Sequence, residues 1–347
     1  MLKHLEQLLK SPRELALVYA CEYADSFSSF ALDYVFVLYL SMCFGMSDVA
    51  ASWIYGIFGI MSLLFGILFG PLIDNIGVKW SLVLGTLTST FARLALVFVT
   101  DTVTLFATLL VLLPMGVALT SNVLKLGIRR YTTSVSRSSA FDCSYLVINS
   151  AALSAAIMLT VTRTIIPDFG LPYRPYLLLA CIPGFVQFFI TLFLRETAID
   201  EATQSLTEHF GSTFPKTYTR SNSSQSAYEL VLSVNPLVVT TFLPLMSMCL
   251  HGKNYDPYNL LVLGTSLSAA SMFVLANFSS VTGAVVGVAC FTFGEMIWAP
   301  RLLELSVMVG QEGREGTVLA LSAIPRYIAR LFAGASSGYL LETFCTL

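Results

Sequence analysis

The sequence predicts an all-α membrane protein with about ten transmembrane helices. Of its 347 residues, 56% are hydrophobic and only 12% are charged, and the mean hydropathy is +0.76. A soluble domain has about twice this share of charged residues, because its surface faces water. Most of this surface must therefore face lipid, where backbone polar groups have to be bonded within helices or a closed barrel.

Ten apolar runs are long enough to cross a bilayer as a helix, which takes about 20 residues. They cover residues 15–44, 51–72, 81–100, 103–127, 140–162, 174–195, 230–250, 258–278, 281–307 and 316–341. None of the runs shows the alternation of a barrel strand, so all are predicted to be helices. We expect an N-terminal six-helix bundle in 1–195, a polar linker in 196–229 and an incomplete C-terminal bundle of about four helices in 230–347.

The distribution of Lys and Arg predicts the orientation, because cytoplasmic loops carry more of these residues. Lys79 and the pair Arg129–Arg130 lie in even-numbered loops, whereas loops 45–50 and 101–102 contain no Lys or Arg. The N-terminus is therefore predicted to be cytoplasmic, in the plasma membrane or an organelle membrane. Two arginines in a loop that should lie outside, Arg163 and Arg174, are an exception.

Several functions are disfavoured by residues that the chain lacks. The formal net charge of −2 gives no reason to expect a nucleic-acid partner. Cysteine pairs with metal-ligand spacing, HExxH and Walker-type loops are absent, so we expect no metal, no cofactor and no ATP-driven transport. Residues Gly334–Gly338 fit the hydrolase pattern G-x-S-x-G around Ser336, but they lie in an apolar run and no His lies within a span. We interpret them as small residues that let helices pack closely, and expect no enzyme.

Acidic residues lie in the middle of the first predicted helix. At 100° per residue, Glu22, Ser29 and Asp33 fall within about 20° of one another, and Asp25 lies about 60° away. A charge at this depth costs several kcal/mol unless it faces water or a partner. We predict that Glu22, Asp25 and Asp33 carry a coupling proton, since loss of water favours a neutral carboxyl group. The alternative is an internal network of ion pairs.

Three arginines are also predicted inside apolar runs, and they are Arg93, Arg326 and Arg330. Arg93 and Arg326 are the candidates for pairing with the acids of the first helix. Arg326 and Arg330 lie one helical turn apart after Pro325. They either bind an anionic group or pair with those acids, and the sequence leaves both possibilities open.

The loop between the second and third runs resembles the signature of the major facilitator superfamily, in which an Asp and a Gly precede a basic residue. It reads Gly70-Pro71-Leu72-Ile73-Asp74-Asn75-Ile76-Gly77-Val78-Lys79. We assign Gly70, Asp74, Gly77 and Lys79 to a gating loop. Glycine permits a tight turn, and Asp74 can cap or pair at a helix end that rearranges. An ordinary polar hairpin is the alternative.

Five further segments, in chain order, resemble the proton-dependent oligopeptide transporter family. They are Glu22-Tyr23-Ala24-Asp25-Ser26-Phe27, Lys125, the segment Phe141 to Leu153, Asn235-Pro236 with Pro244, and Gly294-Glu295. The match is partial, because Ser26 stands where that family has Arg. The resemblance implies a two-bundle fold with a mid-membrane cavity. It also implies a substrate site, to which we assign Lys125, Tyr145, Asn149, Glu295 and Trp298.

These observations together predict a secondary active transporter, with protons and a small solute as partners within the lipid bilayer. Symport of a peptide or amino acid by alternating access suits a cavity that holds both signs of charge. Another solute, such as an organic anion, a sugar or a drug-like molecule, is the first alternative, and the missing first-helix Arg favours it. A non-transporting paralogue or sensor is the second alternative.

The superfamily that the chain resembles has twelve spans, so two are missing, and we expect these to be the seventh and the twelfth. Loss of the seventh span would invert all later helices unless 196–229 crosses the membrane, as a short helix near 206–218 or as an extended segment. We expect such a crossing, which places 251–257 on the side of Lys79. An incomplete gene model is an equally good cause of the missing spans.

Overall fold

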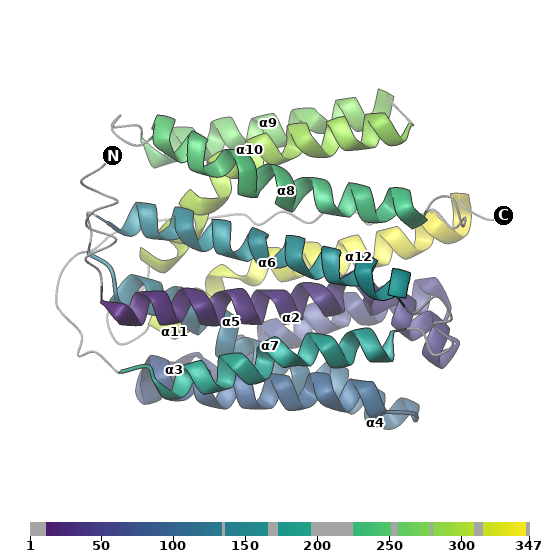
Figure 1. Ribbon diagram of the computed structural model, residues 1–347, viewed down its shortest axis with the longest axis horizontal. Coiled ribbons are helices and arrows are strands. Elements are labelled where there is room, and N and C mark those ends of the chain that lie inside the picture. The colour runs from purple at the N-terminus through teal and green to yellow at the C-terminus, as the bar shows by residue number, and fades with distance from the viewer. Residues whose placement is uncertain are drawn as a thin grey trace.

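The computed structural model describes residues 12–133, 136–165, 173–195, 225–250, 256–277, 280–308 and 315–344. Within these ranges the regular secondary structure is entirely helical. The long helices run roughly along one common direction and pack side by side, as Figure 1 shows. This is the arrangement expected of helices that cross the same bilayer.

Residues 12–195, here called the first half, contain the helices that precede the linker. They are α2 (Arg13–Phe44), α3 (Asp48–Phe98), α4 (Thr102–Ala107), the π-helical turn η1 (Thr108–Leu112), α5 (Leu113–Arg130), α6 (Arg137–Ile165) and α7 (Arg174–Leu192). The 51 residues of α3 make two spans, because Gly77 breaks the helix with φ 79° and ψ −179°. Only glycine adopts this backbone conformation without strain, so the tight turn predicted at Gly77 is present.

Residues 225–344, the second half, contain α8 (Gln225–Leu250), α9 (Pro257–Asn277), α10 (Val281–Met308), α11 (Glu315–Ser322) and α12 (Ile324–Phe344). Among the described residues, eight helices are long and apolar enough to cross a membrane. α3 supplies two spans, and α8 adds a shorter apolar segment, Ser233–Ser247. The ten runs predicted from the sequence are therefore all helical.

Local sequence signals explain several helix ends. The Ser47 hydroxyl accepts a hydrogen bond from the backbone N–H of Ala50 at 3.2 Å, and so caps α3. The Asp101 carboxylate accepts from the N–H of Thr104 at 2.7 Å, which holds the pKa of this loop carboxyl below its ordinary value. Gly45 ends α2 in the left-handed conformation, with φ 65°.

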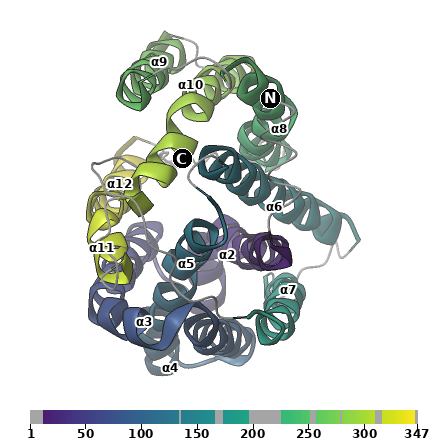
Figure 2. The ribbon, with the colours of Figure 1, turned by 90° about the vertical axis from the view of Figure 1, so that its left-hand side faces the viewer.

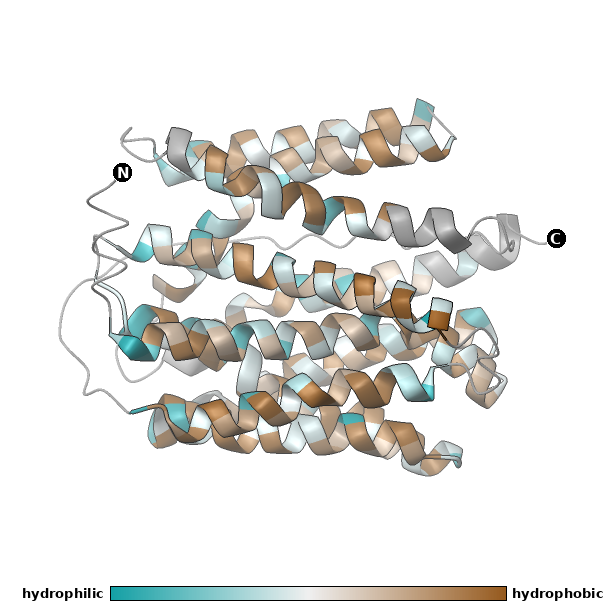
Figure 3. Cartoon of the chain, in the orientation of Figure 1, coloured by the Kyte–Doolittle hydropathy of each residue, from teal (hydrophilic) through white to brown (hydrophobic). Residues whose placement is uncertain are grey.

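Hydrophobic residues recur along the length of the helices, as Figure 3 shows, and many of the large ones are exposed. Leu68, Phe189 and Phe273 are 66%, 59% and 75% exposed. Exposing one such side chain to water costs about 1.5–3 kcal/mol relative to burying it. Many large apolar side chains share this exposure, so the helices are suited to lipid and the chain is a multi-pass membrane protein.

The ends of the helices show how the two halves are oriented. The Tyr131 hydroxyl, just after α5, donates to the carbonyl of Arg195 at 2.8 Å, so α7 ends on the side where α5 ends. Near the end of α8, the Ser247 hydroxyl donates to Asp142 at 2.7 Å, beside the start of α6 on that same side. α8 therefore ends on the side where α7 ended, and starts on the opposite side (Figure 1).

This arrangement agrees with the prediction that the helices after the linker are not inverted. α9 packs antiparallel to α10, which places the start of α9 and the end of α10 on the side of Lys79. The helices of the second half thus keep the predicted orientation relative to the first half, although its described residues form only four spans. The predicted helix near 206–218 lies outside the described residues.

Candidate functional site

The buried acid Glu22 faces another helix rather than lipid. Its side chain is 3% exposed, and its Oε1 accepts a hydrogen bond from the Ser144 hydroxyl of α6 at 2.8 Å. Its other oxygen, Oε2, is buried and has no hydrogen-bond partner among the described residues. A buried carboxylate with one unsatisfied oxygen favours binding a proton or a further donor.

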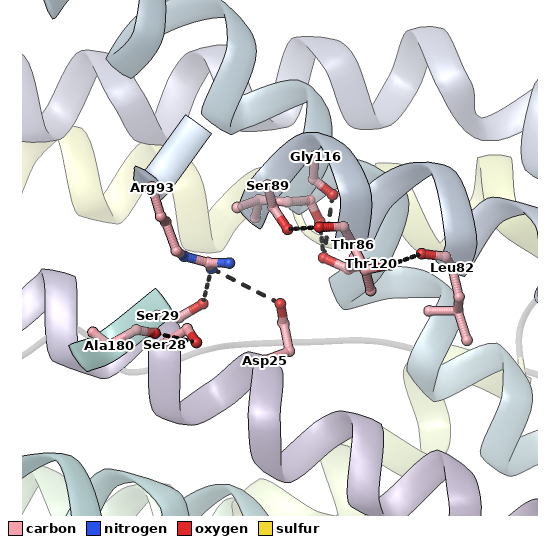
Figure 4. A network of polar contacts seen from close by, with 11 residues as sticks. Asp25, Ser28, Ser29, Leu82, Thr86, Ser89, Arg93, Gly116, Thr120 and Ala180 are labelled. Carbon is pink, nitrogen blue, oxygen red and sulfur yellow. Dashed lines mark hydrogen bonds and ion pairs between the residues drawn. The ribbon is translucent and has the colours of Figure 1, made fainter. Parts of the chain in front are cut away.

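A second acid of α2 belongs to the polar network drawn in Figure 4. Nη2 of Arg93, in the second span of α3, donates to the Ser29 hydroxyl at 2.8 Å and lies 3.9 Å from Oδ1 of Asp25. Thr120 of α5 also hydrogen-bonds Asp25. The ion pair is long, and Nε and Nη1 of Arg93 have no hydrogen-bond partner within the described part of the chain. The network is thus polar, buried and only partly satisfied.

Lys125 lies between these acids and the second half. It is 9% exposed on α5, and its charge interacts with Glu22, Asp25 and Arg326 of α12. A lysine near a helix end can instead extend its side chain to the lipid headgroups, but that arrangement does not fit this burial. Lys125 therefore belongs to the same buried charge cluster as the two acids.

The two arginines of α12 differ in their partners. Nη2 of Arg330 lies 2.7 Å from Oδ1 of Asp33, and its guanidinium stacks 4.0 Å from the ring centre of Tyr55. Arg330 thus pairs with a first-helix acid, which was one of the two possibilities left open. Arg326 lies over the ring of its neighbour Tyr327 at 5.0 Å and interacts with Lys125. The three acids of α2 and Ser29 all have contacts inside the protein.

Glu295 has partners from α8 and α6. Nδ2 of Asn235 donates to its Oε2 at 2.6 Å, and the buried Tyr145 hydroxyl interacts with the same carboxylate. Tyr145 directly follows Ser144, the partner of Glu22, so α6 lies between the two acids. Figure 2 shows α6 between α2 on one side and α8 and α10 on the other. That Lys125 and Glu295 approach one shared cavity stays a prediction.

Two residues that were predicted to bind substrate form hydrogen bonds within the protein. The amide of Asn149 donates to the carbonyl of Tyr145 on its own helix at 2.9 Å. The indole N–H of Trp298 donates to the Ser268 hydroxyl of α9 at 3.1 Å. Trp298 thus faces α9, the helix packed against α10 on the side away from α6 (Figure 2), and we leave it out of the site proposed below.

The predicted gating loop contacts the second half. The Asp74 carboxylate accepts from the Thr317 hydroxyl at 3.1 Å and from its N–H at 3.4 Å, at the start of α11. A Cβ on Gly70 would lie 2.6 Å from Cα of Thr317, so only glycine lets α3 and α11 approach this closely. Lys79 lies two residues after the turn at Gly77.

Sequence reasoning missed one ionic cluster between the halves. Nη2 of Arg301, on α10, lies 3.0 Å from both carboxylate oxygens of Asp142 on α6. Arg301 also contacts Glu304 at 3.1 Å and the Ser138 hydroxyl. Charged residues in two predicted spans, one of them directly after Pro300, were the available signal, because a charge inside a span needs a partner.

Other chemistry has little support. Within the described residues, His, Cys, Asp and Glu form no group of three that could hold a metal ion. Ser336 lies in the middle of α12, where its hydroxyl donates to the carbonyl of Ala333 at 3.3 Å. A hydrolase nucleophile would instead occupy a strand-to-helix turn.

The structure is similar to solved transporters, whereas no family model and no curated protein matches the sequence. The human organic anion transporter MFSD10 (TETRAN) matches with a TM-score of 0.68 at 12% identity, over 95% of this chain and 94% of that one. A POT family transporter in complex with a thioalcohol-conjugated peptide matches with 0.71 at 15% identity, over 96% and 91%. A POT family transporter in complex with 5-aminolevulinic acid matches with 0.69 at 15% identity, over 95% and 91%. The chain therefore has the major facilitator fold.

Proposed function

We propose that this protein is a secondary active transporter that moves a small charged solute together with protons. The observation that carries the proposal is the buried cluster of Glu22, Asp25, Arg93 and Lys125, within helices that cross the membrane and next to the second half. Charged groups at this depth are costly, and in membrane proteins they mark ion and substrate paths. The fold supplies two halves that can alternate around such a site.

Glu22 is the best candidate for the proton carrier. Its Oε1 accepts a hydrogen bond from Ser144. Its Oε2 has no hydrogen-bond partner among the described residues and can therefore take a proton. Lys125 interacts with Glu22, so protonation of Glu22 removes a negative charge that partly neutralises Lys125. The positive charge of Lys125 is then more available to a solute. This link between proton and solute is what symport requires.

The solute class follows from the signs of charge around the site. Lys125 and Arg326 can bind an anionic group, and Glu295 with Tyr145 can bind an ammonium group or another donor. A peptide or amino acid carries both groups. An organic anion is the second candidate, favoured by Ser26, which leaves the first helix without the Arg of the peptide transporters. The similarity to an organic anion transporter supports the same alternative.

The test is uptake by the purified full-length protein in proteoliposomes. We expect Glu22→Gln to abolish uptake driven by a pH gradient, while exchange of solute at equal pH survives. Labelled dipeptides and labelled organic anions, compared in the same assay, distinguish the two solute classes. Glu14→Gln is the matched control, because Glu14 lies on the same helix but pairs with its neighbour Arg13.

Two outcomes would contradict the proposal. Equal loss of gradient-driven uptake and exchange in Glu22→Gln would assign Glu22 to substrate binding or structure rather than to proton coupling. No solute-dependent proton flux with any solute of either class would favour the non-transporting alternative.

A further inference from the structure

Buried polar atoms without partners gather inside the first half, between α2, α3 and α7. Nε and Nη1 of Arg93, Oγ1 of Thr90 and both polar amide atoms of Gln187 have no hydrogen-bond partner within the described part of the chain. The three residues are 5%, 2% and 0% exposed. A buried polar group in a folded protein is nearly always bonded to the protein or to ordered water. These atoms therefore indicate a place where a further hydrogen-bonding partner can bind.

Helix contacts place the three side chains around one space. At 100° per residue, Thr90 and Arg93 lie about 60° apart on α3. A Cβ on Gly184 would lie 2.6 Å from Oγ1 of Thr90, so Thr90 faces α7. The charge of Arg93 interacts with the thiol of Cys181 on α7. Gln187 follows Gly184 by about one turn, on the same buried stripe of α7.

The opposite directions of the two helices bring Arg93 and Gln187 closer together. Arg174, at the start of α7, donates to the carbonyl of Val97 near the end of α3 at 2.8 Å, so α7 is antiparallel to the second span of α3. Side chains on a helix lean toward its N-terminus. Arg93 and Gln187 therefore lean toward each other, at the level of Thr90.

α2 forms the third side of this space. The Ser28 hydroxyl donates to the carbonyl of Ala180 on α7 at 2.8 Å, as Figure 4 shows. Nη2 of Arg93 donates to Ser29 but stays 3.9 Å from Oδ1 of Asp25, which has no hydrogen-bond partner among the described residues. A water molecule can bridge two polar atoms at this separation.

The mixture of donors and acceptors identifies the ligand. The Arg93 nitrogens only donate hydrogen bonds, and the Asp25 carboxylate oxygen only accepts them. The Thr90 hydroxyl and the Gln187 amide can do both. An anion would leave the acceptors unbonded, and a metal cation would leave the donors unbonded. Water can serve both kinds of group, so ordered water fits this set of atoms.

Buried hydroxyl groups continue from this space toward the side of Lys79. Thr86 lies one turn before Thr90 on α3, Thr191 lies one turn after Gln187 on α7, and both are fully buried. Each donates to a carbonyl of its own helix, at 2.7 and 2.6 Å. Their oxygens can still accept a hydrogen bond from water, so the polar lining extends in this direction.

We propose that ordered water between α3 and α7 forms a proton path from the Arg93–Asp25 pair toward the side of Lys79. Thr90 and Gln187 position this water. When Asp25 releases its proton, the adjacent water takes it and passes on one of its own, so one O–H bond breaks for each that forms. Asp25 becomes a carboxylate beside Arg93, and one proton leaves on the side of Lys79. Polar side chains and water relay protons in this way inside membrane proteins.

The path lies inside the first half, whereas the solute site proposed above lies next to the second half. The inference therefore goes beyond the proposed function, because it concerns protons alone and does not depend on which solute, if any, is moved.

X-ray footprinting of the purified full-length protein, read out by mass spectrometry, tests for the water. Irradiation converts bound water into hydroxyl radicals that oxidise adjacent sulfur atoms. Cys181 is only 2% exposed but lies beside Arg93, so we expect it to be oxidised. Met296 is the matched control, because it is also 2% exposed but packs among apolar side chains of the second half, and it should stay unmodified.

The rate at which Asp25 loses its proton after a jump to higher pH tests the path. Stopped-flow infrared spectroscopy follows the C=O band of the protonated carboxyl group, assigned to Asp25 by its loss in Asp25→Asn. The assignment is needed because other titratable groups face Asp25, namely Lys125 on α5 and Cys21 and Glu22 on its own helix. Thr90→Val and Gln187→Met remove polar groups at nearly constant size. We expect each to slow the loss of the band by about tenfold, as for the loss of one hydrogen bond.

Two variants control for changes in packing. Thr90→Ser keeps the hydroxyl group and should keep the wild-type rate even if it lowers the melting temperature. Thr88→Val removes a hydroxyl about 160° away around the same helix, which donates to the carbonyl of Leu84, and should leave the rate unchanged.

Several results would overturn the inference. They are an unmodified Cys181 in the wild type, the absence of any infrared band that belongs to Asp25, wild-type rates in Thr90→Val and Gln187→Met, and a rate in Thr90→Ser as low as in Thr90→Val. None of these readouts requires solute uptake. If the expected results are obtained but proteoliposomes take up no solute, the proton path stands and the transport proposal falls.

Discussion

Two of the ion pairs in the described part of the chain connect the halves of the molecule, and they are built differently. Asp142 and Arg301 join α6 to α10 on the side of Lys79, with side chains 8% and 9% exposed and two contacts of 3.0 Å. Asp33 and Arg330 join α2 to α12 nearer the opposite side, with side chains 27% and 20% exposed and one contact of 2.7 Å. The first pair is buried and bidentate, and the second is partly open.

The contacts around each ion pair add to the difference between the two pairs. The first pair includes hydrogen bonds from Ser247 to Asp142 and from Arg301 to Glu304. On the same side, Arg129 donates to the carbonyl of Val307 at 2.8 Å. The second pair is supported instead by stacking of Arg330 on aromatic rings. The halves are therefore held together by more contacts on the side of Lys79, and the transport proposed above would require this side to open in turn.

The largest effect is expected for Arg301→Gln. Removing the arginine leaves Asp142 buried without its cation, which typically costs about 3–5 kcal/mol. We expect a lower melting temperature and faster maleimide labelling of Cys143, the half-buried neighbour of Asp142, in a variant that keeps only this cysteine. The double variant Asp142→Asn/Arg301→Gln should recover part of the loss, since the residue at position 142 then carries no charge. Unchanged labelling of Cys143 in Arg301→Gln would show that the pair does not hold this side closed.

A smaller effect is expected for Arg330→Gln. Asp33 is partly exposed, so the loss should fall between about 1 kcal/mol for exposed pairs and about 3 kcal/mol for buried ones. Labelling of Cys43, near the end of α2, should rise in a variant that keeps only that cysteine, while Cys143 in its own single-cysteine variant should not respond. If Cys143 responds as strongly as Cys43, the two pairs are not independent and the comparison fails.

The smallest effect is expected for Thr317→Val. This change removes the hydroxyl that donates to Asp74 at 3.1 Å but keeps the backbone N–H contact at 3.4 Å. The loss of one hydrogen bond corresponds to about 0.5–1.5 kcal/mol in melting experiments. Gly70→Ala tests the same contact by crowding instead, because the added Cβ would approach Thr317 to 2.6 Å. If Gly70→Ala destabilises no more than Thr317→Val, close helix approach is not the role of this glycine.

The sequence by itself determined the spans and the charges that lie within them, and it predicts the orientation of the chain. Long apolar runs are a local property, and the distribution of Lys and Arg sets the side of each loop, so these predictions need no knowledge of which helices touch. The same holds for the turn at Gly77 and for the alignment of Glu22, Ser29 and Asp33, because both follow from backbone geometry.

Only the tertiary structure decided which charges pair. Arg93 lies beside Asp25 and Arg330 beside Asp33, while the similar Arg326 is left beside Lys125. The tie between Asp142 and Arg301, and the contact of Trp298 with α9, were likewise decided by packing. Sequence spacing gives the face of its own helix on which a residue lies, but not which helix meets that face. That choice depends on how all the helices pack at once, since each pairing excludes others.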